Sequence, residues 1–236
     1  MSTTPLETGP MTDDVLRGIF ASDQDVYPAP LTWDRLRSWT TAAPDLATCF
    51  YLPDNGPSAA AAAAATRTIV GAVVALPLLA PAWRDLLAGR IKETDIDAAS
   101  MLARDDGGDD EGSRVVVGLH VFHVERFDVP EARESGVLRG FGSIAMRAVV
   151  AAAEGKGWEV IGHSALTATA AGKRCFEQLG FEPTGYEEFW VADMRGGVEL
   201  VTVSANTAGD GRVVPDEATV RGHARMFAKH LPSHPA

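Results

Sequence analysis

The sequence has little cysteine and a deficit of positive charge. Its two cysteines, Cys49 and Cys175, are too few for a disulfide framework. Its 32 Asp+Glu residues outnumber 21 Lys+Arg residues, so the formal net charge is −11. This balance disfavours a nucleic-acid partner, because phosphate backbones bind to clustered positive charge. An acidic surface instead favours a cationic small substrate, which its field attracts.

Long apolar segments are also missing. The longest apolar stretch, residues 69–83, is short for a membrane span and contains Pro77 and Pro81. The N-terminus lacks the basic and apolar regions of a signal peptide. We therefore expect a cytoplasmic protein with no membrane partner. The composition, 46% hydrophobic and 22% charged residues in a chain of 236, is typical of one globular domain with additions.

The patterning of the residues predicts a mixed α/β (α+β) domain. Thr12 and Thr32 precede segments with helical spacing of apolar residues and are placed to cap them. Short apolar runs rich in β-branched residues predict strands, and Ala-rich segments ended by glycine predict helices. Strands are expected at 46–52, 69–76, 115–127 and 158–165, helices at 142–154 and 170–179, and a hairpin at 187–193 and 198–204. This order favours a mixed sheet over a doubly wound one.

One domain is expected to span residues 12–204. Residues 1–11 are expected to be a flexible leader. Residues 205–236 are expected to be a C-terminal tail with room for one helix, at 216–229. This tail either completes a homodimer or covers the sheet, and the sequence does not choose between the two.

An insertion, residues 78–113, interrupts the predicted sheet. It either acts as a lid with Trp83 as an aromatic wall, or covers the edge of the sheet. Its acidic run, residues 105–111, is expected to be a solvated loop because nothing fixes the carboxylates at ligand geometry. We therefore predict no metal site.

The segment from Arg139 to Ala145 combines glycines with the start of a helix. Backbone N–H groups at a helix start are unpaired and lie at the positive end of the helix dipole, so a phosphate is a natural ligand. Gly140 and Gly142 would let an anion approach the backbone closely. A turn that only starts a helix is the simpler alternative. The residues also match the dinucleotide pattern G-x-G-x-x-A, but here a long loop separates them from the preceding strand.

With its surroundings, this segment resembles the GNAT superfamily of acyl-CoA N-acyltransferases. That family carries R/Q-x-x-G-x-G/A after its fourth strand, then a strand, then a helix ending in a pattern like L-Y-E-K-L-G-F. This chain reads Arg139-Gly-Phe-Gly-Ser-Ile144 and later Cys175-Phe-Glu-Gln-Leu-Gly-Phe181. The resemblance is sharp over 115–181 and looser over 12–204. It implies a GNAT-like mixed, mostly antiparallel sheet with splayed central strands and flanking helices.

The resemblance also implies an activity, direct transfer of an acetyl group from acetyl-CoA to an amine. A small-molecule amine acceptor is preferred, because no basic groove or peptide-recognition signature is visible. The CoA pyrophosphate would rest on the backbone after the long strand, and the pantetheine would pair with that strand. The residues implied for CoA binding are Val124, Arg139, Gly140, Phe141, Gly142, Ser143, Ile144, Thr169, Lys173 and Phe176.

Glu125 and His123 are the candidate catalytic residues. Side chains alternate along a strand, so these two share one face. A carboxylate at this level resembles the family's usual general base, although an exposed strand end is the simpler reading. The same alternation places His120 on the opposite face, as a packed or hydrogen-bonded core residue. His163, on the next strand, could reach the splay but is better explained as structural.

Two departures from the family pattern keep an alternative function open. Ile144 stands where the family has Gly or Ala, and Phe176 where it commonly has a Tyr general acid. A thiolate is a tolerable leaving group, so loss of the acid need not abolish transfer. Tyr186 could replace the phenol only if its strand reaches the thioester. The alternative is a non-catalytic acyl-CoA-binding or sensing module, and a nucleotide-dependent oxidoreductase is a weaker third reading.

Overall fold

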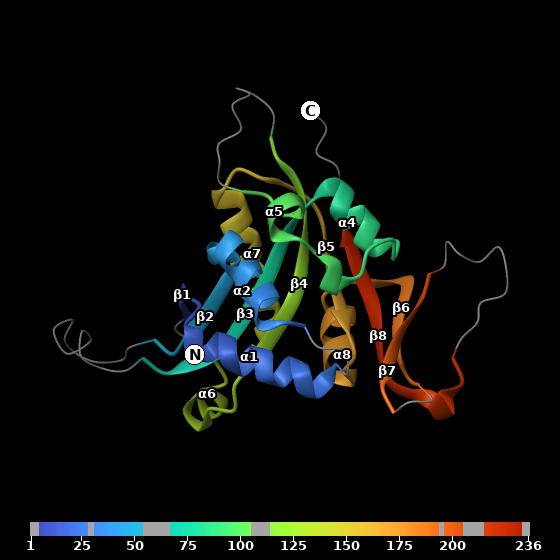
Figure 1. The fold of residues 1–236 in the computed structure, drawn as a ribbon. Coiled ribbons are helices and arrows are strands. Elements are labelled where there is room, and N and C mark those ends of the chain that lie inside the picture. The colour runs from blue at the N-terminus through green and yellow to red at the C-terminus, as the bar shows by residue number, and fades with distance from the viewer. Residues whose placement is uncertain are drawn as a thin grey trace.

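One eight-stranded sheet organises the chain (Figure 1). The computed structural model describes residues 5–27, 31–53, 67–104, 114–193, 196–204 and 215–232. The strand order is β1-β2-β3-β4-β5-β8-β6-β7, in which β4 and β5 pair in parallel and the other neighbours are antiparallel. The strands are β1 (Glu7–Pro10), β2 (Ala47–Tyr51), β3 (Ile69–Leu79), β4 (Val116–Arg126), β5 (Glu159–Thr167), β6 (Glu182–Ala192), β7 (Val198–Val203) and β8 (Val220–His230).

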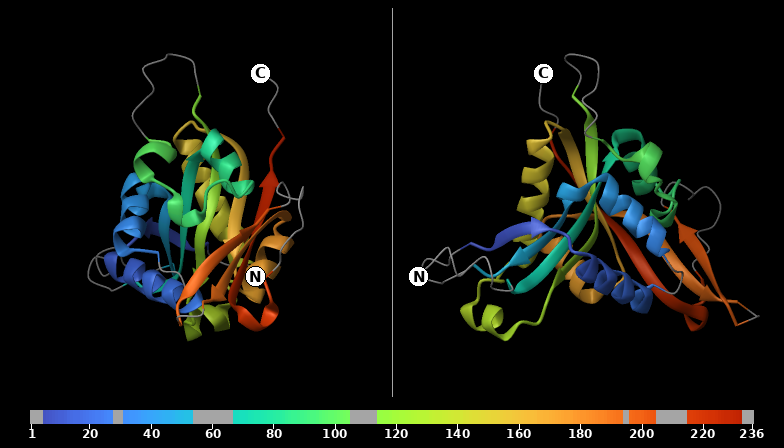
Figure 2. Two further views of the ribbon diagram at one scale, coloured as in Figure 1. Left: turned by 45° about the vertical axis from the view of Figure 1, so that its right-hand side comes forward. Right: turned by 60° about the vertical axis from the view of Figure 1, so that its left-hand side comes forward.

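Helices cover both faces of this sheet (Figure 2). The first face carries α1 (Asp13–Val26), α2 (Trp33–Ala42), α4 (Ala80–Leu87) and α5 (Ala98–Met101). The second face carries α6 (Pro130–Ser135), α7 (Phe141–Gly155) and α8 (Ala170–Gln178). Short 3-10 helices are η1 (Pro44–Leu46), η2 (Glu93–Asp95) and η4 (Glu217–Thr219). Each face has its own apolar core, with Trp39 and Leu86 buried on the first and Phe141 and Val149 on the second.

Both predicted N-caps are confirmed. The Thr12 hydroxyl oxygen accepts a hydrogen bond from the Val15 N–H at 3.3 Å, and the Thr32 hydroxyl oxygen accepts one from the Arg35 N–H at 3.2 Å. Each bond satisfies one of the N–H groups that have no partner within the helix. The two caps fix where α1 and α2 begin on the first face of the sheet.

The central strands separate at one end. The parallel register runs from Val116 opposite Glu159 to Val121 opposite Ala165, and β4 then continues to Arg126 without a partner in β5. The edge of β4 that would face β5 is therefore open beyond Val121. The sheet is mixed and mostly antiparallel, with splayed central strands and flanking helices, as the resemblance to the GNAT superfamily predicts.

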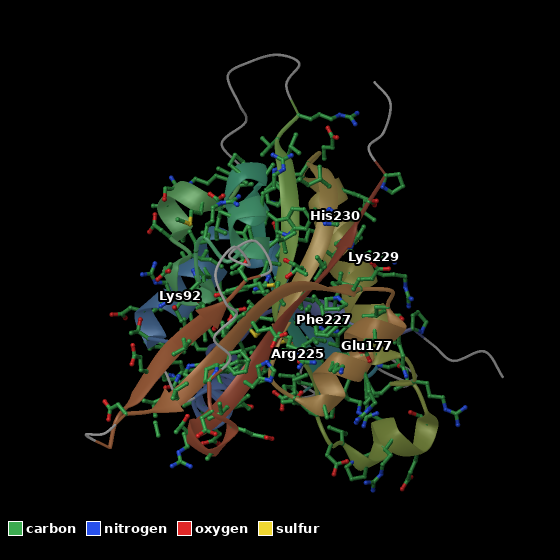
Figure 3. All side chains as sticks on the ribbon, turned by 90° about the vertical axis from the view of Figure 1, so that its right-hand side faces the viewer. Lys92, Glu177, Arg225, Phe227, Lys229 and His230 are labelled. Carbon is green, nitrogen blue, oxygen red and sulfur yellow. The ribbon has the colours of Figure 1, made fainter. Side chains whose placement is uncertain are left out.

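The helix predicted at 216–229 is wrong. This segment contains β8, which lies between β5 and β6 and pairs with both. Its Ala, Met, Arg and Lys residues are good helix formers, but pairing on both edges outweighs that weak preference. Arg225, Phe227 and Lys229 follow one another along β8, and the Lys229 ammonium donates a hydrogen bond to the Leu179 carbonyl oxygen at 3.0 Å, just after α8 (Figure 3).

Smaller expectations also need correction. The leader is not wholly flexible, because Glu7–Pro10 form β1 against β2 and Glu7 pairs with Arg67. The loop after β4 contains the short helix α6. In the insertion, β3 extends to Leu79 and α4 follows directly, while only η2 and α5 form further on. The alanine run 59–65 and the acidic run 105–111 lie outside the described residues. In the described segments, no helix is long and apolar enough to cross a membrane.

Candidate active site

A cavity of about 320 Å³ lies where β4 and β5 separate. Helix α1 crosses the sheet near this end of β4 and extends toward α8 (Figure 1). The cavity is lined by Ser22, Asp23, Val26 and Tyr27 from α1 and its end, Val121 to Glu125 from β4, Leu166 to Thr169 around the end of β5, and Gly172 and Phe176 from α8. Four elements distant in sequence thus enclose one site.

A β-bulge in β4 sets which side chains face this cavity. His123 lies opposite Val74 of β3 and Val121 lies opposite Ala75, which leaves Phe122 as the extra residue. A bulge reverses the simple alternation of side chains. As a result His120 and His123 both lie on the first face of the sheet. The expectation that they lie on opposite faces was wrong, because the sequence does not mark the bulge.

His123 and Glu125 form a polar pair at the cavity. His123 Nε2 lies 3.1 Å from Glu125 Oε2, and both residues line the cavity. The hydrogen bond from His123 lowers the pKa of Glu125 below its ordinary value. The Glu125 side chain is 38% exposed, so it stays ionised in contact with solvent. The structure therefore brings the two predicted catalytic residues together.

Asp23 is a third ionisable group in the cavity, and sequence reasoning missed it. It is only 7% exposed, and its carboxylate has no hydrogen-bond or ion-pair partner among the described residues. Burial is the main cause that raises the pKa of Asp23 to about 7. Glu93 adds to the rise where it is ionised, and His123 opposes it. The sequence did indicate that Asp23 is buried, because it follows Leu16 and Ile19 at helical spacing on the same face of α1.

Tyr27 brings a phenol to the same cavity from the end of α1. Its hydroxyl donates to the Leu166 carbonyl oxygen at 3.4 Å, and its ring packs edge-on against Trp190 at 5.2 Å between centroids. Burial and the nearby charge of Glu93 raise the pKa of Tyr27, so the phenol stays protonated. By contrast Tyr186 donates to Glu188 at 2.7 Å and is absent from the cavity lining.

Five of the predicted site residues line the cavity and seven do not. Those in the lining are His123, Val124, Glu125, Thr169 and Phe176. Thr169 also caps α8 by accepting from the Gly172 N–H at 3.0 Å. Arg139, Gly140, Phe141, Gly142, Ser143 and Ile144 lie at the start of α7, and Lys173 lies 3.8 Å from Glu177 on α8.

The start of α7 leaves the backbone N–H groups of Gly140 and Gly142 without a hydrogen-bond partner in the described chain. The N–H groups around them, those of Arg139, Phe141, Ser143 and Ile144, already donate to carbonyl oxygens of the turn. Gly140 is its N-cap with a φ of +66°, a conformation that suits glycine, and no side chain caps the helix. The space where a Gly140 Cβ would stand is open. At Gly142 a Cβ would lie 2.5 Å from the Cys175 sulfur, so this glycine also lets α7 pack closely on α8. Phe141 is a core residue, packed edge-on against Phe50 at 5.1 Å.

A buried polar chain lies behind the cavity on the first face. His120 Nδ1 is 2.9 Å from the Ser164 hydroxyl oxygen and Nε2 is 2.7 Å from Glu93 Oε1, while the Trp83 indole N–H donates to Ser164 at 2.9 Å. Burial lowers the pKa of His120 to about 3 and raises that of Glu93 to about 8. Both shifts favour the neutral forms, in which a protonated Glu93 would donate to His120 Nε2. His120 is thus the hydrogen-bonded core histidine expected.

Two other side chains considered from the sequence lie outside the cavity. Trp83 is buried against the sheet, so it forms no wall of this site. His163 packs against the Phe181 ring at 6.2 Å, and burial lowers its pKa to about 4. In the described chain no three His, Cys, Asp or Glu residues are grouped to hold a metal.

Comparison with known proteins finds similarity in structure alone. No family model matches the sequence, and no curated protein is significantly similar to it. Arabidopsis thaliana NAA60 in complex with acetyl-CoA is 10% identical, with 96% of this chain and 99% of that chain covered and a TM-score of 0.49. Ard1 from Thermoplasma volcanium is 9% identical (98% and 100% covered, TM-score 0.46). The Escherichia coli ribosomal-protein-S18-alanine N-acetyltransferase is 10% identical (98% and 96%, TM-score 0.43).

Proposed function

We propose that this protein is an N-acetyltransferase that moves an acetyl group from acetyl-CoA directly to an amine. The observation that carries the proposal is the splay itself. Beyond Val121 one edge of β4 has no strand partner, and a cavity lined by ionisable groups lies beside it. A pantetheine chain can pair with that edge near Val124, and a backbone N–H there would stabilise the oxyanion that forms on the thioester carbonyl.

Acetyl-CoA as co-substrate fits the residues present. The pyrophosphate would rest on the start of α7, which no side chain caps and where the backbone N–H groups of Gly140 and Gly142 make no hydrogen bond within the described residues. Gly140 leaves the approach open. Ile144, bulkier than the family's Gly or Ala, packs against the second-face core. Its bulk is therefore accommodated by packing. When bound, CoA would supply the activated acetyl group as a thioester.

Glu125 and His123 are proposed as the catalytic residues that lead the proton of the amine to solvent. The pair lies at the cavity, and Glu125 is accessible to water. An amine attacks only in its neutral form, so a proton must leave before or during transfer. Thr169 and Phe176 would lie against the thioester end of CoA, and Lys173 near its phosphates.

The proposed acceptor is a small-molecule amine. The cavity is of a size that suits a small ligand, and its carboxylates attract a cation. A panel of small amines and of peptides with free N-termini, assayed by thiol release, tests this preference. Higher kcat/KM for the peptides would replace the small molecule by a peptide acceptor.

A thermal-shift titration with acetyl-CoA, CoA and NAD(P)H tests the proposal as a whole. A ligand that binds the folded state raises its stability by mass action. We expect a saturable shift with both CoA forms and none with the dinucleotides. Absence of a shift with either CoA form up to millimolar concentration would overturn the assignment.

Phe176 supports a second candidate, a non-catalytic acyl-CoA-binding module. It lines the cavity at the position where the resemblance implies a proton-donating Tyr, and it packs against Phe181 at 5.1 Å. The two candidates differ in turnover. A sensor would bind acetyl-CoA and release no thiol with any amine, whereas an enzyme would do both.

A further inference from the structure

Asp23 is placed to receive the amine of the acceptor. We propose that its carboxylate is the catalytic base, which binds the acceptor's ammonium group and takes its proton. This inference rests on the proposed acetyl transfer and identifies the acceptor as an amine that is a cation in solution. It also assigns to α1 a catalytic role that sequence patterning gave to β4 alone.

The position of Asp23 is the first argument. Three helical positions of α1 face the sheet, and the first two, Leu16 and Ile19, are buried and apolar. Asp23 is the third, and it lies where α1 passes over the open end of the splay. It therefore shares one cavity with Val124, along which the thioester would lie.

The lack of a partner is the second argument. The Asp23 residue is only 7% exposed, and no described side chain or N–H group donates to its carboxylate, whose oxygens reach the open space of the cavity. Burying an unpaired carboxylate is unfavourable, and proteins seldom retain one without a use. A bound ammonium group would supply both the missing charge and the missing hydrogen-bond donors.

The surroundings of Asp23 raise its pKa, so that its carboxylate can accept and release a proton near neutral pH. Glu93 of η2 and His123 of β4 act on it directly, Tyr27 lies at the end of its own helix, and Glu125 lines the same cavity. The charge of Glu188 of β6 raises the pKa of Tyr27. Burial brings the pKa of Asp23 to about 7, close to the value at which a general base works best at neutral pH.

Glu125 is the weaker base by the same criteria. Its hydrogen bond to His123 lowers its pKa, and it is more exposed. A carboxylate that is already partnered and solvated has less affinity for a proton. Glu125 therefore suits the mouth of the site, where the released proton leaves.

The proposed reaction balances as follows. The ammonium group gives one proton to the Asp23 carboxylate, and the neutral nitrogen attacks the thioester carbonyl carbon. The new C–N bond forms, the C–S bond breaks, and CoA leaves as a thiolate. The acylated nitrogen loses its second proton, which protonates the thiolate. Asp23 then releases its proton to solvent, so that an alkylammonium and acetyl-CoA give an amide, CoA-SH and one proton.

Two variants on the same helix separate this role from a structural one. Asp23→Asn removes the charge with little change in shape, and Asp25→Asn is the matched control because Asp25 is exposed. The probe is butylamine, an ammonium ion at pH 7, titrated calorimetrically into the CoA-bound protein, with 1-butanol as its neutral counterpart. We expect binding of butylammonium to weaken at least about tenfold in Asp23→Asn and to be unchanged in Asp25→Asn, and 1-butanol not to bind.

The pH profile of transfer provides the second readout. We expect Asp23→Asn to lower kcat/KM about 100-fold near pH 7 with an alkylamine acceptor, and the deficit to shrink as pH approaches the pKa of the amine. Loss of a merely structural contact would give a deficit independent of pH. Should Asp23→Asn fail to fold, Asp23→Ala carries the same expectation.

The outcomes separate the two proposals. If CoA does not bind the unmodified protein, the acetyltransferase proposal fails. If CoA binds but butylammonium binds both proteins equally, or neither, the role of Asp23 is overturned and the acetyltransferase proposal stands. A pH-independent deficit would likewise remove Asp23 from catalysis.

Discussion

Two carboxylates in the same cavity have opposite environments. Asp23 is buried without a partner, and its pKa rises from an ordinary 3.8 to about 7. Glu125 is partly solvated and hydrogen-bonded by His123, and its pKa falls. Pairs of acids whose pKa values are driven apart are a common feature of acid–base sites. The contrast arises from burial and partners and not from residue type.

Asp23 should make stability depend on pH. Because its folded-state pKa is raised, the folded state binds the proton more tightly than the unfolded state. The ionised Asp23 carboxylate lowers the free energy of unfolding, and this loss grows as pH rises from about 4 to about 7 and is constant at higher pH. A rise of about three pKa units sets an upper limit of about 4 kcal/mol on the loss. We expect Asp23→Asn to be more stable than the parent at pH 8 and nearly equal at pH 4.

Urea unfolding at several pH values measures this difference. Glu93 and Glu188 also have raised pKa values, near 8 and 7, so the pH dependence of the parent contains their contributions as well. Taking the difference between parent and variant removes most of that background. Asp25→Asn, on the exposed side of α1, is expected to leave the curve unchanged. Equal stability of Asp23→Asn and the parent at pH 8 would contradict the burial argument.

The sequence predicted some of the residues that line the cavity and missed others for a physical reason. His123 and Glu125 were found because strand alternation is a local property. Asp23 was missed because its importance comes from where α1 crosses the sheet, which no local pattern states. The one indication in the sequence was that Asp23 follows Leu16 and Ile19 on the buried face of an amphipathic helix.

At the scale of elements, Trp83 attaches α4 to the centre of the sheet. Its indole ring occupies the space above Gly118 of β4 and Gly162 of β5, where an added Cβ would lie 2.1 Å and 2.4 Å from ring atoms. The ring is buried, and its N–H donates to Ser164. Glycines at these two positions thus allow the helix to approach the parallel pair closely.

Gly118→Ala should therefore destabilise the fold. The new methyl group has no room unless Trp83 moves and breaks its bond to Ser164, so we expect a loss of about 3 kcal/mol in the free energy of unfolding. Gly18→Ala, in the middle of α1 with open space around its Cβ position, is the control and should gain about 0.5–1 kcal/mol. Chemical denaturation of both variants measures these changes. A free energy of unfolding that is unchanged in Gly118→Ala would show that the Trp83 ring is not confined.

The last strand shows where local preference fails. Segments with strong periodicity, such as α7 and β4, were predicted to within a few residues. The segment of β8 has the composition of a helix, yet it fills the gap between β5 and β6, whose edges would otherwise be unpaired. Long-range pairing of this kind is not encoded in any short window of sequence. The bulge at Phe122 escaped prediction for the same reason.

Phe227 tests the structural weight of β8. Its side chain is 1% exposed in the second-face core. Because a buried Phe→Ala change removes transfer energy and leaves a cavity, we expect Phe227→Ala to lose about 3–5 kcal/mol. Arg221→Ala, exposed on the same strand, should change stability by less than about 0.5 kcal/mol. A small loss for Phe227→Ala in thermal and urea unfolding would contradict the placement of β8 as a central strand.

For the molecule as a whole, net charge distinguishes the two proposed substrates. A protein with a formal charge of −11 would attract a cationic amine and repel the anionic phosphates of acetyl-CoA. The uncapped start of α7 must therefore offset a repulsion, whereas the carboxylates at the cavity act together with the overall field.

Salt should therefore change kcat/KM for the two substrates in opposite directions. Dissolved ions screen charges more than about 10 Å apart at 0.1 M ionic strength. Raising the salt concentration is expected to lower kcat/KM for an alkylammonium acceptor a few-fold and to leave unchanged or raise that for acetyl-CoA. An uncharged aromatic amine serves as control, since its kcat/KM has no long-range attraction to lose. If salt lowered kcat/KM for the cationic and the neutral acceptor alike, the field would have no part in selecting the acceptor, and the preference for a cation would rest on the carboxylates of the cavity alone.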